Sequence, residues 1–255
     1  MIDYLAHVER DAARIAAMGR LGMDAPVPSC PGWTVADLIA HTGVVYAHKA
    51  AIVRDGRVDE QPAPIEPPGA GILDWFEERS SEMLEILTAV DPATPAATWH
   101  APDQTVGFWH RRMAHESVIH RIDAELAHSA VTPIDATLGA DGIDEILLVM
   151  MTGAPDWAET TVADEIVAIT ESDGGRTWRL RAGDFTGTSP RGNSYVAEPT
   201  FFVDTGDQAS AAAIVGAAGD LDAWLWGRRD LSSLVVEGDR ALVDRVRAVA
   251  ADSTQ

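Results

Sequence analysis

The sequence contains one cysteine, Cys30, among its 255 residues. A single thiol excludes an internal disulfide and any metal site built from several cysteines. A chain without disulfides suits a reducing compartment, so we expect a cytoplasmic location. Cys30 stands between Ser29 and Pro31 and has no basic residue nearby in sequence to lower its pKa, which favours a packed turn residue over a nucleophile.

Positive charge is also scarce. The chain has 19 Lys and Arg residues against 40 Asp and Glu residues, and its formal net charge is −21 at pH 7. Binding to a nucleic-acid backbone requires clustered basic side chains, so this balance argues against a nucleic-acid partner.

Long hydrophobic runs are absent as well. No uninterrupted apolar stretch approaches the roughly 20 residues that a membrane-spanning helix needs, so we expect no membrane association. The first residues, MIDYLAHVERD, lack the basic-then-apolar layout of a secretory signal. The hydrophobic content of 46% is ordinary for a globular protein, and the length allows one or two domains.

Apolar residues recur at helical spacing through the first part of the chain. This periodicity predicts four long helices, over residues of about 2–22, 34–54, 72–90 and 105–129, and a shorter helix over about 139–151. Thr34 is a suitable N-cap, and Asp37 three residues later completes a capping box. The segment 55–71 is rich in proline and glycine and is expected to be a connection. Four long helices with one apolar face each favour a bundle.

The pattern changes after Gly153. Residues 165–170 and 176–181 alternate like paired strands around a tight turn at 172–175. Further elements are expected in the order strand, helix, strand and helix, over 211–215, 221–228, 234–237 and 241–250. We therefore predict two domains, a helical bundle over 1–153 and a small α+β domain over 154–255.

The eight histidines all lie between His7 and His128. Glu116 and His120 are four residues apart, so on a helix they point from the same face. Adding His41 from a facing helix gives two histidines and one carboxylate, a set that leaves an open position on a metal ion. Zn²⁺ suits such a site, and Fe²⁺, Mn²⁺ or Ni²⁺ also fit these ligands.

Other interpretations of these residues remain open. Glu116 and His120 could form an ordinary hydrogen-bonded pair on a solvated helix face. Asp123 either orients a ligand histidine or pairs with Arg121. His48 lies on the same helical stripe as His41 and is the weaker claimant to its position. His115 is expected to point elsewhere on its helix, and three further histidines are expected at the surface or in loops, namely His100, His110 and His128.

Two segments resemble signatures of the mycothiol-dependent maleylpyruvate isomerase family. The first, VPSCPGWTVADLIAH, runs from Val27 to His41, and the second, WHRRMAHESVIHRIDA, runs from Trp109 to Ala124. The run LDAWLWGR from Leu221, followed by VVEGD from Val235, is similar to the smaller domain of that family. The resemblance implies an α+β two-domain fold, with an amino-terminal DinB-like up-and-down four-helix bundle followed by a sterol-carrier-like α+β domain.

The resemblance also implies a metal triad at His41, Glu116 and His120. In the family, a metal similar to zinc is taken to activate the thiol of mycothiol, because coordination favours the thiolate. The thiolate adds to an activated double bond, rotation follows, and elimination returns the thiol. The attacking sulfur then comes from the cosubstrate rather than from Cys30.

The resulting hypothesis is a metal-dependent enzyme that uses a mycothiol-like thiol for isomerisation or S-transfer on a small electrophile. The alternative is a non-catalytic stress-response protein that binds a metal or a small ligand. Arg228 could anchor a substrate carboxylate, since arginine binds carboxylates through two parallel hydrogen bonds. It could instead pack on Trp224 or pair with a surface acid.

Overall fold

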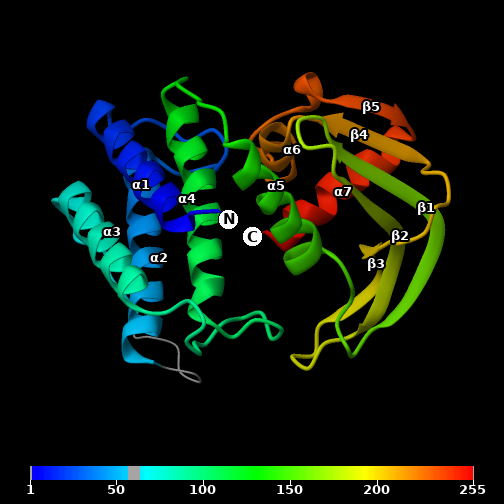
Figure 1. Cartoon of the computed structure of the whole chain (residues 1–255), viewed down its shortest axis with the longest axis horizontal. Coiled ribbons are helices and arrows are strands. Elements are labelled where there is room, and N and C mark those ends of the chain that lie inside the picture. Colours follow the sequence, from blue (N-terminus) through cyan, green and yellow to red (C-terminus); the bar gives the residue numbers. More distant parts are fainter. Residues whose placement is uncertain (1, 57–63, 255) are drawn as a thin grey trace. The chain divides into compact units, whose positions relative to one another are not determined.

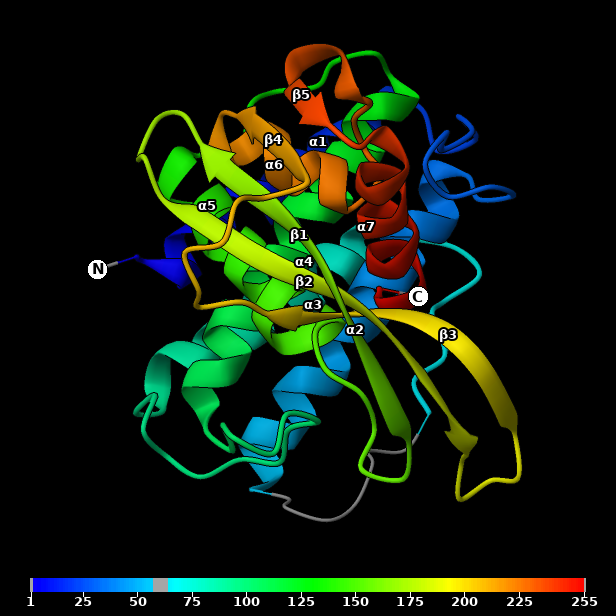
Figure 2. The same ribbon diagram turned by 90° about the vertical axis from the view of Figure 1, so that its right-hand side faces the viewer.

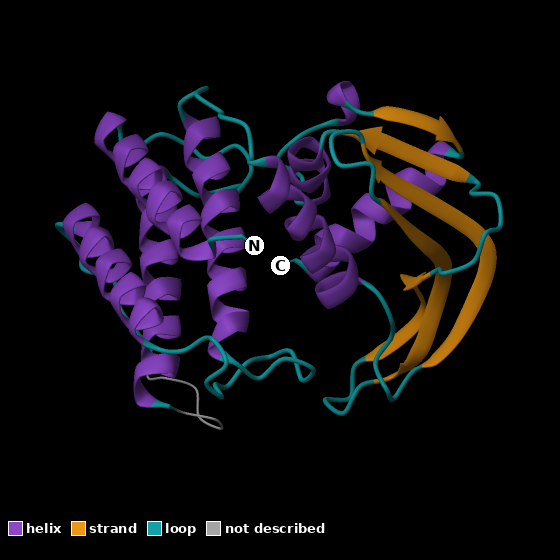
Figure 3. Cartoon of the chain, in the orientation of Figure 1, coloured by secondary structure: helices purple, strands orange, loops and turns teal. Residues whose placement is uncertain are grey.

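The computed structural model describes residues 2–56 and 64–254. The chain divides into two compact units, Met1–Thr132 and Pro133–Gln255. The first is helical and the second combines a sheet with helices, which confirms the predicted two-domain α+β class (Figure 3). Within the described residues, no helix combines the length and the apolar content that crossing a bilayer requires.

The first unit is a four-helix bundle, as predicted. Its helices are α1 (Tyr4–Leu21), α2 (Val35–Asp55), α3 (Ile72–Ala89) and α4 (Val106–Ala127). Contacts join α1 to α4 and α2 to α3, and α2 also packs against α4 (Figure 1). The predicted connection over 55–71 lies partly outside the described residues.

Local sequence signals set the start of α2. The side chain of Thr34 accepts a hydrogen bond from the backbone of Asp37, and the Asp37 carboxylate accepts one from the backbone of Thr34, which confirms the predicted capping box. In the preceding turn, the backbone N–H of Trp33 donates to the carbonyl of Cys30 at 3.0 Å. The capping box and this turn together fix the direction in which α2 begins, and they thereby help to position His41 on that helix.

A close approach joins α2 to α3. Gly43 faces the Trp75 ring so closely that a Cβ atom at this position would lie 2.3 Å from the ring. Further along, Tyr46 stacks on Phe76, and the Tyr46 hydroxyl forms a 2.6 Å hydrogen bond with the Ser117 hydroxyl of α4. These contacts hold α2 between its two neighbours.

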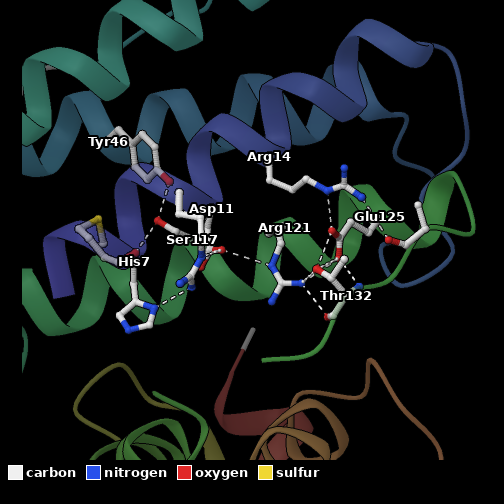
Figure 4. A network of polar contacts seen from close by, with 11 residues as sticks. His7, Asp11, Arg14, Tyr46, Ser117, Arg121, Glu125 and Thr132 are labelled. Atoms are coloured by element: carbon white, nitrogen blue, oxygen red, sulfur yellow. Dashed lines mark hydrogen bonds and ion pairs between the residues drawn. The ribbon is translucent and has the colours of Figure 1, made fainter. Parts of the chain in front are cut away.

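A buried polar network joins α1 to α4 (Figure 4). Glu125 receives hydrogen bonds from Arg14 at 2.7 Å and from Arg121 at 2.8 Å, and Arg121 also pairs with Asp11. The Glu125 side chain is fully buried, and the backbone N–H of Thr132 donates to it. Such charges are stable in the interior only when they are paired, so this network fixes how α1 lies on α4.

The second unit contains a five-stranded sheet in the order β3-β2-β1-β4-β5. Its strands are β1 (Glu159–Glu171), β2 (Thr177–Thr188), β3 (Ser194–Val203), β4 (Ala212–Gly216) and β5 (Val235–Gly238). β1 pairs with β4 in parallel, and the other pairs are antiparallel. The hairpin of β1 and β2 and the strands β4 and β5 confirm the prediction.

Helices pack on one face of this sheet (Figure 2). They are α5 (Ala136–Asp144), which continues into the π-helical turn η1 (Glu145–Met151), α6 (Ala218–Leu225) and α7 (Arg240–Ser253); a short turn, η2 (Leu231–Ser233), precedes β5. The backbones of α5 and α6 meet at two glycines, where a Cβ atom on Gly139 would lie 2.8 Å from the nitrogen of Gly219.

The boundary between the two units lies earlier in the chain than predicted. The prediction placed it after Gly153. The structure divides the chain between Thr132 and Pro133, because α5 packs on α6 and η1 packs on α7. The short helix expected over 139–151 corresponds to α5 and η1, and it belongs to the second unit. Strand β3 was not predicted, because most of its residues are exposed and it contains Pro199.

Candidate metal centre

Three side chains of the bundle converge on one point. His41 comes from α2, and Glu116 and His120 come from consecutive turns of α4. One potential ligand atom from each residue lies within 4.8 Å of the other two. Glu116 Oε1 is 3.7 Å from His41 Nε2 and 3.2 Å from His120 Nε2. The structure therefore brings together the three residues that the sequence singled out.

The three side chains differ in exposure. The side chain of His41 is 41% exposed, whereas those of Glu116 and His120 are 19% and 11% exposed. The ring of Trp33, from the loop before α2, lies 5.0 Å from the His41 ring. Two donors are thus held in the protein interior, and the third is accessible to solvent.

Asp123 orients His120. Its Oδ2 atom lies 3.0 Å from His120 Nδ1, so the opposite ring nitrogen, Nε2, faces Glu116. The Asp123 carboxylate is fully buried and accepts a hydrogen bond from the Ser29 hydroxyl at 2.5 Å. Histidine ligands of metals commonly donate their second N–H to such a carboxylate. Of the two roles considered for Asp123, the structure favours orientation of His120, since Arg121 pairs with Asp11 and Glu125.

Arg112 holds the other oxygen of Glu116. Its Nη2 atom donates to Glu116 Oε2 at 3.0 Å, and the arginine is buried, with 6% of its side chain exposed. This contact leaves Oε1 directed at the two histidines. The spacing of four residues on α4 could have indicated the pair, which the sequence analysis missed.

Electrostatics at this point favour a cation. Burial opposes the ionised form of Glu116, but His120, His41 and Arg112 outweigh it and hold the pKa of this carboxyl well below its usual range. Burial likewise acts to lower the pKa of His120, yet Glu116 and Asp123 raise it to about 9. At neutral pH the pair is therefore a carboxylate and a protonated imidazolium, and a metal ion bound here would take the place of the proton on His120.

Cys30 lies close to this cluster. Its Sγ atom is 3.6 Å from Asp123 Oδ2, although the two residues are far apart in sequence. The thiol belongs to a tight turn and is half-buried, as expected for a packed turn residue. Its place beside Asp123 could not be read from the sequence.

The remaining histidines do not join the three converging residues. His48 contacts Lys49, with 2.9 Å between His48 Nδ1 and Lys49 Nζ. His115 points elsewhere, as expected, and is buried with its ring near that of Tyr4. The surface or loop positions expected for three histidines are only partly observed. His110 is half-buried on α4 with Nε2 3.1 Å from the Leu87 carbonyl, while half-buried His100 lies in a loop and His128 caps α4.

Lys49 is a neighbouring group that the sequence analysis missed. It is the only lysine of the chain, and its ammonium lies 4.6 Å from the centre of the Trp109 ring. Burial lowers its pKa, and the nearby Glu116 carboxylate partly offsets that effect. The presence of a single lysine in such an acidic chain is the feature of the sequence that could have drawn attention to Lys49.

Arg228 lies in the second unit, just after α6. Its side chain donates from Nη1 to the Trp226 carbonyl at 2.7 Å and is half-buried. The contact stabilises the turn that follows α6 and leaves the role of this arginine in substrate binding a prediction.

The chain is similar to known proteins along most of its length. Residues 5–125 match the family described as the mycothiol maleylpyruvate isomerase N-terminal domain, and residues 137–245 match the MDMPI C-terminal domain. A crystal structure of mycothiol-dependent maleylpyruvate isomerase has a TM-score of 0.56 at 14% identity, and that of a histidine-to-alanine mutant has a TM-score of 0.58 at 13% identity. Each match covers 92% of this chain and 91% of the other, and at such identity it shows a shared fold. No significant match exists among curated proteins.

Proposed function

Because the chain belongs to the mycothiol-dependent maleylpyruvate isomerase family, we propose that it is a metal-dependent enzyme that uses a mycothiol-like thiol. It would isomerise a small electrophile or transfer the thiol to it. His41, Glu116 and His120 would hold a divalent metal, with zinc as the first candidate. The convergence of these three donor atoms within 4.8 Å carries the proposal.

The donor set fits such a metal. Two imidazole nitrogens and one carboxylate oxygen are the ligands of many catalytic zinc sites, which keep a further position open. Asp123 holds His120 with Nε2 directed at the cluster, and Arg112 leaves Glu116 Oε1 free to face it. The partial exposure of His41 supports access for a small molecule.

Each neighbouring residue has a defined task in this proposal. Arg112 keeps the Glu116 carboxylate ionised and oriented, and Asp123 keeps His120 in one ring orientation. When bound, the metal would favour the thiolate form of a coordinated thiol near neutral pH. The sulfur nucleophile belongs to the cosubstrate, so Cys30 needs no role in the reaction.

Arg228 remains the proposed anchor for a carboxylate of the electrophile. A guanidinium presents its N–H donors in a planar fork that matches the two oxygens of a carboxylate. Arg228→Ala should raise KM for a carboxylated electrophile. Unchanged turnover of that substrate would contradict the anchoring role.

Metal analysis of the purified protein tests the proposal. We expect near-stoichiometric divalent metal in the wild type and its loss in His41→Ala and Glu116→Ala. His48→Ala is the matched control, because His48 lies on the same helix but outside the cluster, and it should keep the metal. A wild type that binds no metal under any condition would contradict the proposal that the protein is a metal-dependent enzyme. Metal binding without any response to added mycothiol would favour the non-catalytic alternative.

A further inference from the structure

A pocket of about 590 Å³ lies in the second unit, where η1, β3 and the end of α7 pack against one another. Much of its wall is apolar or aromatic and includes Met150, Met151, Phe185, Tyr195 and Val249. This volume lies within the range of pockets that hold small molecules, and such pockets are mostly apolar with a few polar groups. No residue of the candidate metal centre lines it.

A β-bulge between β2 and β3 shapes one side of the pocket. Glu198 of β3 lies opposite Phe185 of β2. Tyr195 lies opposite Gly187, so one residue of β2 between these pairs faces two residues of β3. In a regular strand, side chains three residues apart point to opposite faces. The additional residue in β3 places Tyr195 and Glu198 on the same face as Phe185, and all three line the pocket.

Two further backbone irregularities border this pocket. Ala197, within the bulge, has a φ of +51°, a conformation that residues other than glycine rarely adopt. On the other side, Met150 and Met151 come from the end of η1, which is π-helical. Bulges, π-helical turns and strained backbone are each more frequent at functional sites than elsewhere. Their convergence on one pocket therefore points to a binding site.

The aromatic rings of the pocket wall are supported from behind. The ring centres of Phe185 and Tyr195 are 5.8 Å apart, and the Trp157 ring, which is not part of the lining, lies 5.5 Å from that of Tyr195. A Cβ atom on Gly187 would lie 3.0 Å from the Trp157 ring, so this glycine allows the close approach. The faces of aromatic rings carry partial negative charge.

The charged groups of the lining are carboxylates. Glu198 and Asp252 are both exposed, and neither forms an ion pair within the part of the chain that the structure describes. The hydroxyl groups of Thr200 and Ser253 already donate to backbone carbonyls. None of the described lining residues is basic. The pocket therefore presents two negative charges beside aromatic and apolar surface.

We propose that this pocket binds a small organic cation with an apolar body, of the class of quaternary or protonated amines. Ring faces attract such cations, and the two carboxylates add Coulombic attraction. The flexible methionine side chains adapt to an apolar ligand of irregular shape. The site goes beyond the proposed function, because it uses none of the metal-binding residues and requires no metal.

An NMR titration of the full chain, with isotopically labelled methionine methyl groups, locates the ligand. The probe is benzyltrimethylammonium chloride, and sodium chloride of equal concentration is the reference. The probe's ring should shift the signals of Met150 and Met151, which are assigned by Met150→Leu and Met151→Leu. The signals of Met18, Met83 and Met113, which are buried in the bundle, should not move. Shifts confined to these bundle methionines would overturn the site.

Two sets of variants test the chemistry of the pocket. Glu198→Gln and Asp252→Asn, combined in one protein, should weaken binding of the probe by about fivefold or more. Tyr195→Leu should weaken it by about threefold, whereas Tyr195→Phe keeps the ring face and should stay within about twofold of the wild type. The methionine spectrum without the probe shows whether each variant keeps its fold. The two carboxylates are exposed, so their replacement tests the proposal even where Tyr195→Leu disturbs the wall.

Glu237→Gln is the matched control, because Glu237 is an exposed acid of β5, at the opposite edge of the sheet from β3. It should leave the affinity for the probe within about twofold of the wild type. Weakening equal to that of the double variant would show general attraction to an acidic chain and overturn the site. Benzyl alcohol, which lacks the charge, should bind at least about tenfold more weakly than the probe. Equal affinity for benzyl alcohol would overturn the assignment to cations.

Discussion

At the scale of single residues, the two nitrogens of the His120 ring have different tasks. Nδ1 lies 3.0 Å from Asp123, and Nε2 lies 3.2 Å from Glu116. The Asp123 carboxylate thus fixes the orientation of the ring, and the Glu116 carboxylate lies beside Nε2 at the candidate metal centre. The strength of metal binding should therefore depend on a residue that is not a ligand.

Asp123→Asn tests this dependence. The amide keeps the shape of the side chain but removes the charge that favours the oriented ring. We expect the dissociation constant of the bound metal to rise by about 10- to 100-fold, as it does when other residues that hydrogen-bond to a metal ligand are replaced. A competition titration against a chelator measures it, and Asp135→Asn, at the start of α5, is the control. An unchanged constant would contradict the orienting role.

The sequence predicted the three converging residues, but not the groups that position them. Helical spacing places Glu116 and His120 on one face, and the family resemblance adds His41. Ser29 reaches Asp123 only because the turn before α2 folds against α4, and spacing along one helix carries no such information. For the same reason the sequence left open whether Asp123 would face His120 or Arg121.

At the scale of elements, α1 and α4 are joined by buried charges as well as apolar packing. Burial opposes ionisation of Glu125, but the backbone N–H of Thr132 and the guanidinium groups of Arg14 and Arg121 hold its pKa below the usual value. Its stabilising contribution is thus present above the unfolded-state pKa of about 4.3 and is lost as the pH falls through the lower folded-state pKa.

Glu125→Gln should destabilise the protein by about 3 kcal/mol at pH 7, because it removes a fully buried carboxylate that pairs with buried Arg121 and partly exposed Arg14. The difference from the wild type should shrink as the pH falls below the unfolded-state pKa of about 4.3, and it should be lost once the pH is below the lower folded-state pKa of Glu125. Urea unfolding across this pH range measures both effects. The control is Glu77→Gln, which breaks an exposed ion pair with Arg20 and should cost about 0–1 kcal/mol. A pH-independent difference would contradict the account.

The contact between α2 and α3 depends on Gly43. Alanine is the better helix former by about 1 kcal/mol, but its Cβ would overlap the rigid Trp75 ring, and overpacking costs about 1–3 kcal/mol. Gly43→Ala should therefore lower the free energy of unfolding. In a Trp75→Leu background the same change should be neutral or stabilising, and destabilisation of equal size in both backgrounds would show that the ring is not the cause.

Prediction of elements succeeded where apolar periodicity and capping residues agreed, as in α2. It failed at β3, whose exposed residues provide no alternation. It also failed to predict that His115 is buried, because α4 is buried around much of its circumference and carries polar residues inside, among them Arg112, His115 and Asp123. The boundary between units was displaced because the periodicity of α5 does not reveal which neighbour it packs against.

At the scale of the whole molecule, the net charge of −21 acts on stability. Like charges repel more strongly in the compact state than in the unfolded chain. Raising the salt concentration from about 0.02 M to 0.2 M shortens the screening length, so we expect the free energy of unfolding to increase. Urea unfolding at both concentrations measures this change, and a decrease would contradict the dominance of repulsion.

Family membership extends over both units, since the two matched regions together run from residue 5 to residue 245 with a short gap. The central claim nevertheless rests on three side chains of the bundle. Their chemistry can be tested without knowing the electrophile.

The most direct test is a crystal structure of the metal-loaded protein, with anomalous scattering recorded before and after mycothiol is added. The account predicts one metal peak bound by His41, Glu116 and His120, with metal–nitrogen distances of about 2.0–2.1 Å for zinc. It further predicts that the sulfur of mycothiol takes the open position, at about 2.3 Å from zinc. A metal bound by other residues, or a thiol that never reaches the metal, would contradict it.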